Sequence, residues 1–163
     1  MAQQIQKILD CDILEVEPQV AYDSDYDGML SRAQEQLSAI RQGNYPAIKT
    51  SVEDFDDYDI VFVGYPIWYS SIATPMQTFL HNHASKLSGK RIALFATSGS
   101  SGISTSVDEA RRLCSGATFT ETLLLTSSTL SQMESRVSAW LETLGASREN
   151  NYPSTSMNLK ITV

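Results

Sequence analysis

The sequence predicts an α/β fold in which helices cover a parallel sheet, and three observations support this. Short apolar segments alternate along the chain with segments of helical periodicity. Two of these segments, residues 60–64 (IVFVG) and 91–97 (RIALFAT), are apolar almost throughout, as parallel strands buried on both faces are. With 163 residues, the chain is long enough to bury such a core within one domain.

The predicted strands are rich in aliphatic or β-branched residues and are bounded by Pro, Gly, Asp or Ser. They cover residues 13–17, 60–64, 91–97 and 119–125. The first clear helical pattern lies within residues 28–43, where apolar residues recur every three or four positions and Gly43 offers a stop. Strands and helices that alternate in this order favour right-handed crossovers between parallel strands.

The later helices are predicted from their end signals. Thr74 is expected to be an N-cap, with Pro75 at the first helical position. Ser106 and Glu109 have the spacing of a capping box. The last helix, within residues 128–145, has one apolar stripe made of Leu130, Met133, Val137, Leu141 and Leu144.

The end of the chain differs in composition from the rest. Residues 147–157 are polar and contain Pro and Ser, whereas the last six residues alternate, so that Leu159, Ile161 and Val163 share one face. We therefore divide the chain into a domain at residues 1–146 and a segment at residues 147–163, which is a linker followed by a terminal strand.

Charge and composition exclude several classes of function. Twelve Lys and Arg against 19 Asp and Glu leave a formal charge of −7, which disfavours binding to nucleic acid or anionic membranes. No apolar run approaches the roughly 20 residues that a membrane helix needs. Cys11 and Cys114 lack metal or CxxC spacing, and the start of the chain lacks the pattern of a signal peptide. We infer reduced cysteines and a cytoplasmic location.

Two turns of unusual composition follow the ends of predicted strands. Residues 64–71 (GYPIWYSS) place Ile, Trp and Tyr side by side where a loop should become polar. Residues 96–104 (ATSGSSGIS) combine two glycines, which permit tight backbone angles and close backbone approach, with several hydroxyl groups. Because ligands of open parallel sheets bind beyond the carboxyl ends of strands, we expect a planar heteroaromatic ring here, stacked on Trp68 or Tyr69.

Other interpretations stay open, or fail, for particular residues. In an alternative interpretation that stays open, Trp68 and Tyr69 cap the core or a dimer interface. The serine-rich turn is then a mobile turn that binds no ligand. The acidic residues 53–59 lack the pattern of a calcium loop, and GSSG lacks the GxSxG pattern of a hydrolase. His81 and His83, two apart on a predicted helix, are interpreted as surface histidines. We assign no catalytic residue and no metal ligand.

Five segments between residues 11 and 144 have a familiar order and spacing: EDFDDYD, IVFVG, YPIWYSSIATP, MQTFL and GKRIALFATSGSSGISTSVDEARRLC. In these segments the chain resembles bacterial flavodoxin-like proteins, and PIWY followed by TSGSSG is a specific combination. The resemblance implies a flavodoxin-like three-layer sandwich with a five-stranded parallel sheet, and FMN as the cofactor. The family's ring-binding loop falls on Pro66, Ile67, Trp68 and Tyr69, and its second ring-edge loop on Thr97, Ser98, Gly99, Ser100 and Gly102.

The chain departs from that family at its start. The segment AQQIQKIL matches the later turns of the family's first helix, and CDILEVEP matches the second strand. The first strand and the loop that wraps the FMN phosphate are therefore missing or replaced. Without that central strand, the strands at Ile13 and Ile60 would have unpaired edges.

Three arrangements would repair this gap. The terminal NLKITV would fill the vacant position, although Lys160 and Thr162 suit a strand buried on both faces poorly. A second copy would supply the strand in a homodimer. Alternatively, a longer natural chain continues at both ends, and the terminal strand starts a further β domain. We favour the third arrangement.

The resemblance implies a redox function. FMN, held noncovalently, would carry electrons or hydride equivalents between a reductant and a redox partner protein or a small acceptor such as a quinone. The protein would then be an FMN-dependent oxidoreductase or a non-catalytic electron carrier. The alternative is a flavodoxin-like module that has lost FMN binding and acts in assembly or protein interaction.

Overall fold

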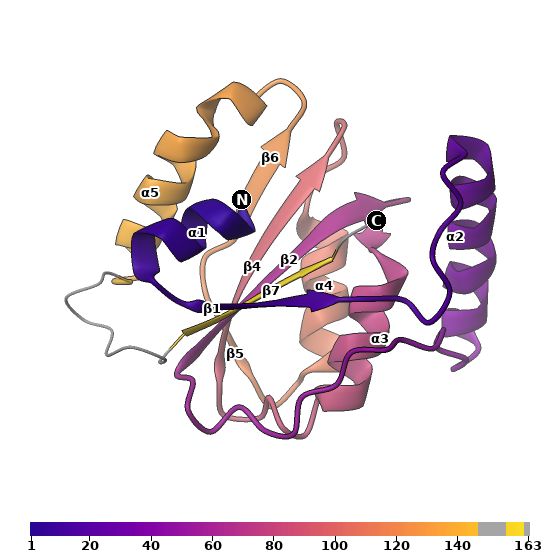
Figure 1. Ribbon diagram of the computed structural model, residues 1–163, viewed down its shortest axis with the longest axis horizontal. Helices are drawn as coiled ribbons and strands as arrows, with labels where there is room; N and C mark the ends of the chain where they lie inside the picture. Colours follow the sequence, from indigo (N-terminus) through magenta and orange to yellow (C-terminus); the bar gives the residue numbers. More distant parts are fainter. Residues whose placement is uncertain (147–155, 162–163) are drawn as a thin grey trace.

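The computed structural model describes residues 1–146 and 156–161, and it has an α/β fold with a mostly parallel sheet between helical layers (Figure 1). The strands are β1 (Asp12–Val16), β2 (Ile60–Trp68), β3 (Ser71–Ile72), β4 (Arg91–Ser98), β5 (Thr118–Phe119), β6 (Leu123–Thr126) and β7 (Ser156–Ile161). The helices are α1 (Ala2–Leu9), α2 (Tyr26–Arg41), α3 (Thr74–His83), α4 (Ser104–Leu113), the 3-10 helix η1 (Leu130–Gln132) and α5 (Met133–Thr143). None of the described helices has the length and apolar character needed to cross a membrane.

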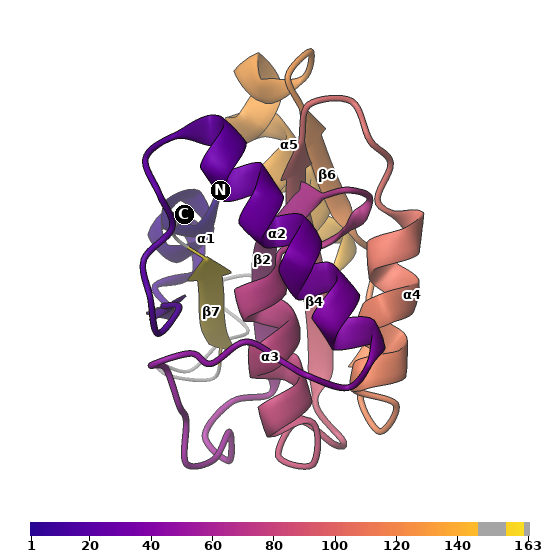
Figure 2. The ribbon, with the colours of Figure 1, turned by 90° about the vertical axis from the view of Figure 1, so that its right-hand side faces the viewer.

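Each face of the sheet has its own core. Alternate residues of β2 and β4 belong to opposite cores, because successive side chains of a strand point to opposite faces. Val61 and Val63 pack in a cluster with α3 and α4, whereas Phe62 packs in a cluster with α1 and α5. Helix α2 lies outside these layers, in contact with α3 (Figure 2). The near-continuous apolar runs are thus strands buried on both faces, as predicted.

The sheet has the order β1-β7-β2-β4-β5, with β6 also paired to β4 and β3 antiparallel to β2. Strand β7 runs parallel to both β1 and β2, and Leu159 is in register with Leu14 and Val63. The terminal strand therefore occupies the vacant central position, which is the first of the three arrangements and not the one that we favoured.

This arrangement was disfavoured because Lys160 and Thr162 suit a strand buried on both faces poorly, and Thr162 lies outside the described residues. Lys160 is the register partner of acidic Glu15 on one side and of Gly64 on the other. A homodimer was expected because β1 and β2 would have unpaired edges. Strand β7 pairs with both strands, so that reason no longer applies, and the homodimer stays a prediction. The division at residue 146 and the further β domain also stay predictions, and the linker expected at residues 147–155 lies outside the described residues.

Two predicted segments have different boundaries in the structure. The residues taken as an apolar loop belong to a hairpin, because β2 continues to Trp68 and pairs with β3 across the two turn residues Tyr69 and Ser70. The single strand predicted at residues 119–125 is two short strands, β5 and β6, which both pair with β4.

The predicted N-caps of α3 and α4 are wrong. Helix α3 has Ala73 as its N-cap, and the hydroxyl of Thr74 contacts Tyr22 and Gln36 instead. In α4 the hydroxyl of Ser106 donates to the carbonyl oxygen of Ile103 at 2.7 Å, so Ser106 does not cap the helix. The Thr74 hydroxyl is held by tertiary contacts, and the Ser106 hydroxyl also lies 2.9 Å from the Tyr65 hydroxyl. Local spacing in the sequence does not show such contacts.

Candidate functional site

A cleft of about 600 Å³ lies beside the carboxyl ends of β2 and β4. It brings together the two turns that the sequence analysis selected, and the first turns of α2 form a third wall. The lining residues are Pro66, Ile67, Trp68 and Tyr69 from the hairpin, Thr97, Ser98, Gly99 and Ser101 from the turn after β4, Tyr26, Met29 and Leu30 from α2, and Ser127 after β6. Two of the predicted ring-edge residues, Ser100 and Gly102, do not line this cleft.

The two aromatic residues of the hairpin have different environments. The Trp68 side chain is 7% exposed and packs against Ala33 and Ala73. Tyr69 is 48% exposed. The core-capping interpretation therefore holds for the Trp68 ring, although Trp68 still borders the cleft, and Tyr69 offers the flat surface on which a ligand ring could stack.

The turn that carries Tyr69 is conformationally unfavourable. Tyr69 has a φ of 50° and Ser70 a φ of 66°. Two positive φ angles are typical of the tight hairpin turns in which Asn and Gly are preferred. An L-residue in this region costs roughly 1–2 kcal/mol. Strained backbone of this kind concentrates at functional sites, which supports a role for the exposed Tyr69 ring.

Tyr22 packs against the ring of Trp68. The two rings meet edge to face, with 5.2 Å between their centroids. The Tyr22 hydroxyl contacts the side chains of Gln36 and Thr74. The guanidinium carbon of Arg32 lies 4.1 Å from the centre of the Tyr22 ring. Burial raises the pKa of the Tyr22 hydroxyl above its ordinary value, so Tyr22 is a neutral, fixed support for the hairpin.

Glu109 on α4 is hydrogen-bonded to the hairpin. Its carboxylate accepts a hydrogen bond from the Ser71 hydroxyl at 2.8 Å and another from the Ile72 N–H at 2.9 Å. One helical turn earlier, the Ser106 and Tyr65 hydroxyl oxygens lie 2.9 Å apart in the core. Burial raises the pKa of Tyr65 to about 12. The inner side of α4 thus fixes both strands of the hairpin.

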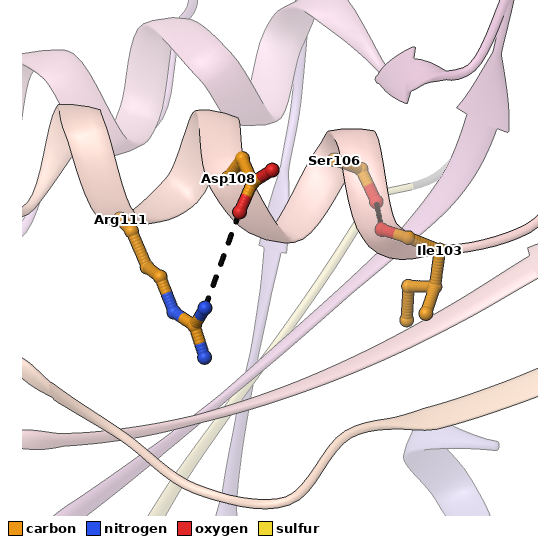
Figure 3. A network of polar contacts seen from close by, with 4 residues as sticks. All are labelled: Ile103, Ser106, Asp108 and Arg111. Carbon is orange, nitrogen blue, oxygen red and sulfur yellow. Dashed lines mark hydrogen bonds and ion pairs between the residues drawn. The ribbon is translucent and has the colours of Figure 1, made fainter.

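The outer side of α4 is different in character. Asp108 and Arg111 form an ion pair with 4.0 Å between a carboxylate oxygen and a guanidinium nitrogen. Figure 3 shows this pair away from the hydrogen bond between Ser106 and Ile103. Both charged side chains are mostly exposed, and such pairs contribute little to stability. Asp108 is therefore a suitable control for Glu109, because it is an acidic residue of the same helix without the hairpin contacts.

The turn after β4 offers backbone groups to the cleft. Its shape is maintained by the Ser98 hydroxyl, which donates to the carbonyl oxygen of Ser101 at 2.6 Å, and by the Ser127 N–H, which donates to the carbonyl oxygen of Gly99. Gly99 and Gly102 do not have positive φ angles. The tight backbone angles that the two glycines were expected to permit are therefore not used in this turn. A Cβ at either position would meet open space, so Gly99 leaves room for a ligand to approach the backbone.

A smaller cavity of about 170 Å³ adjoins the cleft and shares Pro66 and Thr97 with it. Met1 and Ala2, at the start of α1, line it together with Gly64. Since Gly64 is the register partner of Lys160, the carboxyl end of β7 lies beside the same cavity. The last strand and the first helix therefore meet beside this cavity. The start of a helix favours anions.

Metal ligation finds no support in the described residues, which contain no group of three His, Cys, Asp or Glu that could hold an ion. The prediction that His83 is a surface residue is wrong, because its side chain is 2% exposed. Its Nδ1 lies 2.7 Å from the Phe79 carbonyl oxygen, and its Nε2 accepts from the Val52 N–H at 3.0 Å. His83 is thus a neutral structural residue, whereas His81 is exposed, as predicted.

Comparison with known proteins identifies the family. The family model Flavodoxin_4, described as flavodoxin, matches residues 1–144. The chain belongs to the flavodoxin family. The resemblance inferred from PIWY and TSGSSG is thereby confirmed, and so is the flavodoxin-like fold class.

Several solved structures have folds similar to that of this chain. A candidate flavoprotein from Bacteroides eggerthii DSM 20697 is 29% identical, with a TM-score of 0.71 over 88% of this chain and 87% of that chain. Another from Bacteroides uniformis ATCC 8492 is 23% identical, with a TM-score of 0.68 over 83% and 86%. A flavoprotein in complex with FMN from Lactobacillus acidophilus NCFM is 24% identical, with a TM-score of 0.62 over 80% and 85%. The comparison with curated proteins gave no match.

The α2 wall of this flavodoxin cleft was missed in the sequence. Tyr26, Met29 and Leu30 line the cleft, but the apolar period of α2 placed Leu30 with the core-facing residues. The usable signal was Tyr26 itself, because an aromatic residue within the acidic run DSDYDG has no apolar neighbours to bury it.

Proposed function

We propose that this protein binds FMN in the cleft and acts as a redox protein. The observation that carries the proposal is that the hairpin and the turn after β4 line one cleft, and that Tyr69 of the hairpin is exposed there. Membership of the flavodoxin family and the FMN complex of the Lactobacillus acidophilus relative support it.

The residues present fit a flat, largely apolar ring. The exposed face of Tyr69 would stack on it, and backbone groups of Thr97, Ser98 and Gly99 would bond its polar edge. The smaller cavity, between the start of α1 and the end of β7, would take the phosphate side. Bound FMN supplies one-electron and two-electron transfer. Because none of the described residues that line the cleft is charged and the formal charge is −7, the site would not stabilise negative charge on the reduced cofactor.

A second candidate function is kept for one reason. The described residues that line the smaller cavity, where the phosphate side would lie, include no Lys or Arg. A flavodoxin-like module that has lost FMN and acts in assembly or protein interaction accounts for the lack of a cation there. In the redox proposal, the electron acceptor is a partner protein or a small molecule.

A titration with FMN tests the proposal. The purified protein should show the visible absorption of flavin, or acquire it when FMN is added. Replacing Tyr69 by Ala should lower FMN affinity roughly tenfold, because a stacking surface is lost, whereas Tyr69→Phe should retain most of the affinity. Leu130→Ala, at an exposed apolar residue outside the cleft, is the matched control. A protein that takes up no FMN would favour the second candidate.

A further inference from the structure

A second cavity, of about 590 Å³, is lined by residues of α2, α3 and α4. Its volume is that of a small-molecule site. None of its lining residues lines the cleft assigned to FMN. Figure 2 shows the last turns of α2 beside α4 and in front of α3. We call this cavity the helix pocket, and it is a separate site.

Two arginines line the helix pocket from different helices. Arg41 is the last residue of α2, and Arg112 lies in the last turn of α4. Both are exposed. Among the residues that the structure describes, neither has an ion pair or a side-chain hydrogen bond. The helix pocket therefore contains two positive charges that the described part of the chain does not pair.

A helix end could by itself account for such arginines, because cations interact favourably with the last carbonyl groups of a helix. At the end of α2, however, the carbonyl oxygens of Ala39 and Ile40 already accept hydrogen bonds from backbone N–H groups of residues 42–44. The Arg41 guanidinium is therefore not needed to satisfy them and is available to a ligand.

One acidic residue, Glu109, lines the helix pocket. Its carboxylate accepts hydrogen bonds from the Ser71 hydroxyl and the Ile72 N–H. Arg112 follows one helical turn later, but the ion pair that the described residues of α4 show is the one between Asp108 and Arg111. The lining of the helix pocket thus has an excess of positive charge, in a chain whose formal charge is −7.

Much of the remaining lining is apolar or aromatic. Leu37, Ile40 and Leu113 supply aliphatic surface. Tyr45 and His81 also line the helix pocket, and their rings stack with 3.9 Å between the centroids and 6° between the planes. A stacked pair offers a flat face to a further ring. Cations beside apolar and flat surfaces favour an anion that carries an aromatic ring.

We propose that the helix pocket binds a phosphate monoester that carries an aromatic ring. Its phosphate group would bind Arg41 and Arg112, and its ring would pack against Ile40 and the His81 ring. A phosphate monoester has about −1.5 to −2 charges at pH 7, and guanidinium groups match phosphate in charge and in hydrogen-bond geometry. This inference does not rest on the proposed FMN function, because the two sites share no lining residue.

The first experiment locates the binding of phenyl phosphate. The probe is titrated into isotope-labelled protein, and changes in amide chemical shift identify the residues near it. The changes should be concentrated in residues 37–45, 77–81 and 109–113, and not in residues 66–69 or 97–101. The titration is done with FMN-loaded and with FMN-free protein, and the two should give the same affinity.

The second experiment tests the arginines. Arg41→Gln and Arg112→Gln should each weaken phenyl phosphate binding about three- to tenfold, because a charge-assisted contact is lost. Arg111→Gln is the matched control. It makes the same change in net charge on the same helix, but Arg111 pairs with Asp108 and does not line the helix pocket. It should leave the affinity unchanged.

The third experiment separates the parts of the ligand. Phenyl phosphate should bind more tightly than inorganic phosphate, which has no ring, and than benzoate, which has a single negative charge. Ile40→Ser should weaken phenyl phosphate binding and leave inorganic phosphate binding unchanged. Equal affinities for phenyl phosphate and inorganic phosphate would overturn the aromatic part of the proposal. Tighter binding of benzoate would overturn the choice of a phosphate.

The remaining outcomes are decisive in the same way. Absence of phenyl phosphate binding overturns the inference. Equal weakening by Arg111→Gln and Arg112→Gln also overturns it, because net charge alone would then explain the binding. Shifts confined to residues 66–69 and 97–101 would place the probe in the cleft assigned to FMN and would overturn it as well. Failure of the protein to take up FMN refutes the redox proposal alone, because the FMN-free titration still decides this inference.

Discussion

At Gly64 the backbone of β2 lies close to a side chain of β4. A Cβ at this position would lie 2.2 Å from two ring atoms of Phe95. Phe95 is 4% exposed, and its ring packs against Trp140, so it has little room to move. Gly64 also lines the smaller cavity beside α1. A residue without a side chain is therefore needed where the sheet, the Phe95 ring and the cavity meet.

Replacing Gly64 by Ala should destabilise the protein by about 1–3 kcal/mol, because the added methyl group forces the Phe95 ring out of its packed position. Urea unfolding measures this change. Gly102→Ala is the matched control, because a Cβ at Gly102 meets nothing within 4 Å, and it should leave the free energy of unfolding unchanged or slightly raised. Equal stability of the two variants would show that Phe95 can relax.

His83 gives the protein a pH dependence near neutrality. Burial lowers its pKa below the ordinary 6.5, because the charged form loses hydration, and the Nε2 that would take the proton accepts from the Val52 N–H. The unfolded chain therefore binds this proton at a higher pH than the folded chain. The stability that comes from a neutral His83 is present above pH 6.5 and is lost as the pH falls below it.

Urea unfolding at several pH values between about 7.5 and 5.5 tests this expectation. The free energy of unfolding should fall with pH in the wild-type protein. His83→Gln should flatten that dependence whatever its stability at pH 7.5, and His81→Gln, at an exposed histidine, should retain it. A steep pH dependence in His83→Gln would assign the effect to other groups.

The chemistry of the site residues could be read from the sequence, but their exposure could not. The motif PIWY indicates a flat apolar surface, and the structure divides it between the buried Trp68 and the exposed Tyr69. That division depends on Tyr22, which lies far from Trp68 in sequence and packs against its ring. His83 was misread for the same reason, because Val52 satisfies its Nε2 from a distant segment.

At the scale of elements, the hairpin of β2 and β3 depends on α4. Its second strand has two residues, Ser71 and Ile72, and both donate to the Glu109 carboxylate. Hydrogen bonds to a charged acceptor are stronger than neutral ones, and a donor left buried without a partner is costly. One carboxylate of α4 thus fixes the strand that follows the Tyr69 turn.

Glu109→Ala should destabilise the protein by about 2 kcal/mol and should also weaken FMN binding severalfold, because the Tyr69 turn loses its anchor. Chemical unfolding and an FMN titration measure the two effects. Asp108→Ala removes an acidic residue of the same helix without touching the hairpin and should leave both quantities near the wild-type values. Loss of stability with unchanged FMN affinity would separate the hairpin from the flavin site.

The types of the elements followed from periodicity, whereas several of their ends did not. Alternating β and α patterns predicted α2 to α5, the strands β1, β2 and β4, and one strand in the region of β5 and β6, since burial imposes those periods. Helix α1 was inferred from the resemblance and not from a pattern of its own. The ends are decided by contacts from elsewhere. Thr74 bonds Tyr22 and Gln36 in place of capping α3, and Glu109 bonds the hairpin in place of completing a capping box with Ser106.

At the scale of the whole molecule, β7 completes the sheet between β1 and β2. The resemblance of the chain predicted a flavodoxin-like sheet and also the gap in it. The sequence did not decide which segment fills the gap. Polar residues that alternate in a strand argue against burial on both faces, and the sequence does not show which neighbours such a strand has. The register beside Glu15 and Gly64 shows them.

A backbone substitution tests this arrangement. Asn158 is the register partner of Ile13 and Phe62, so Asn158→Pro should remove ladder hydrogen bonds in the middle of the sheet and destabilise it by about 3 kcal/mol or more. Asn158→Thr is the control and should be tolerated, because Thr favours strands. If Asn158→Pro unfolds at the same urea concentration as the wild type, β7 is not part of the sheet in solution.

The position of β7 also sets the time at which the protein can fold on the ribosome. Asp12 pairs with Met157, across nearly the whole length of the chain. Translation proceeds at about 5–20 residues per second, so roughly 5–20 seconds separate the synthesis of β2 from that of β7. During that interval the nascent chain holds two apolar strands whose facing edges have no neighbour. The sheet can therefore be completed only after β7 has been synthesised, and chaperones that bind exposed strands have a defined window in which to act.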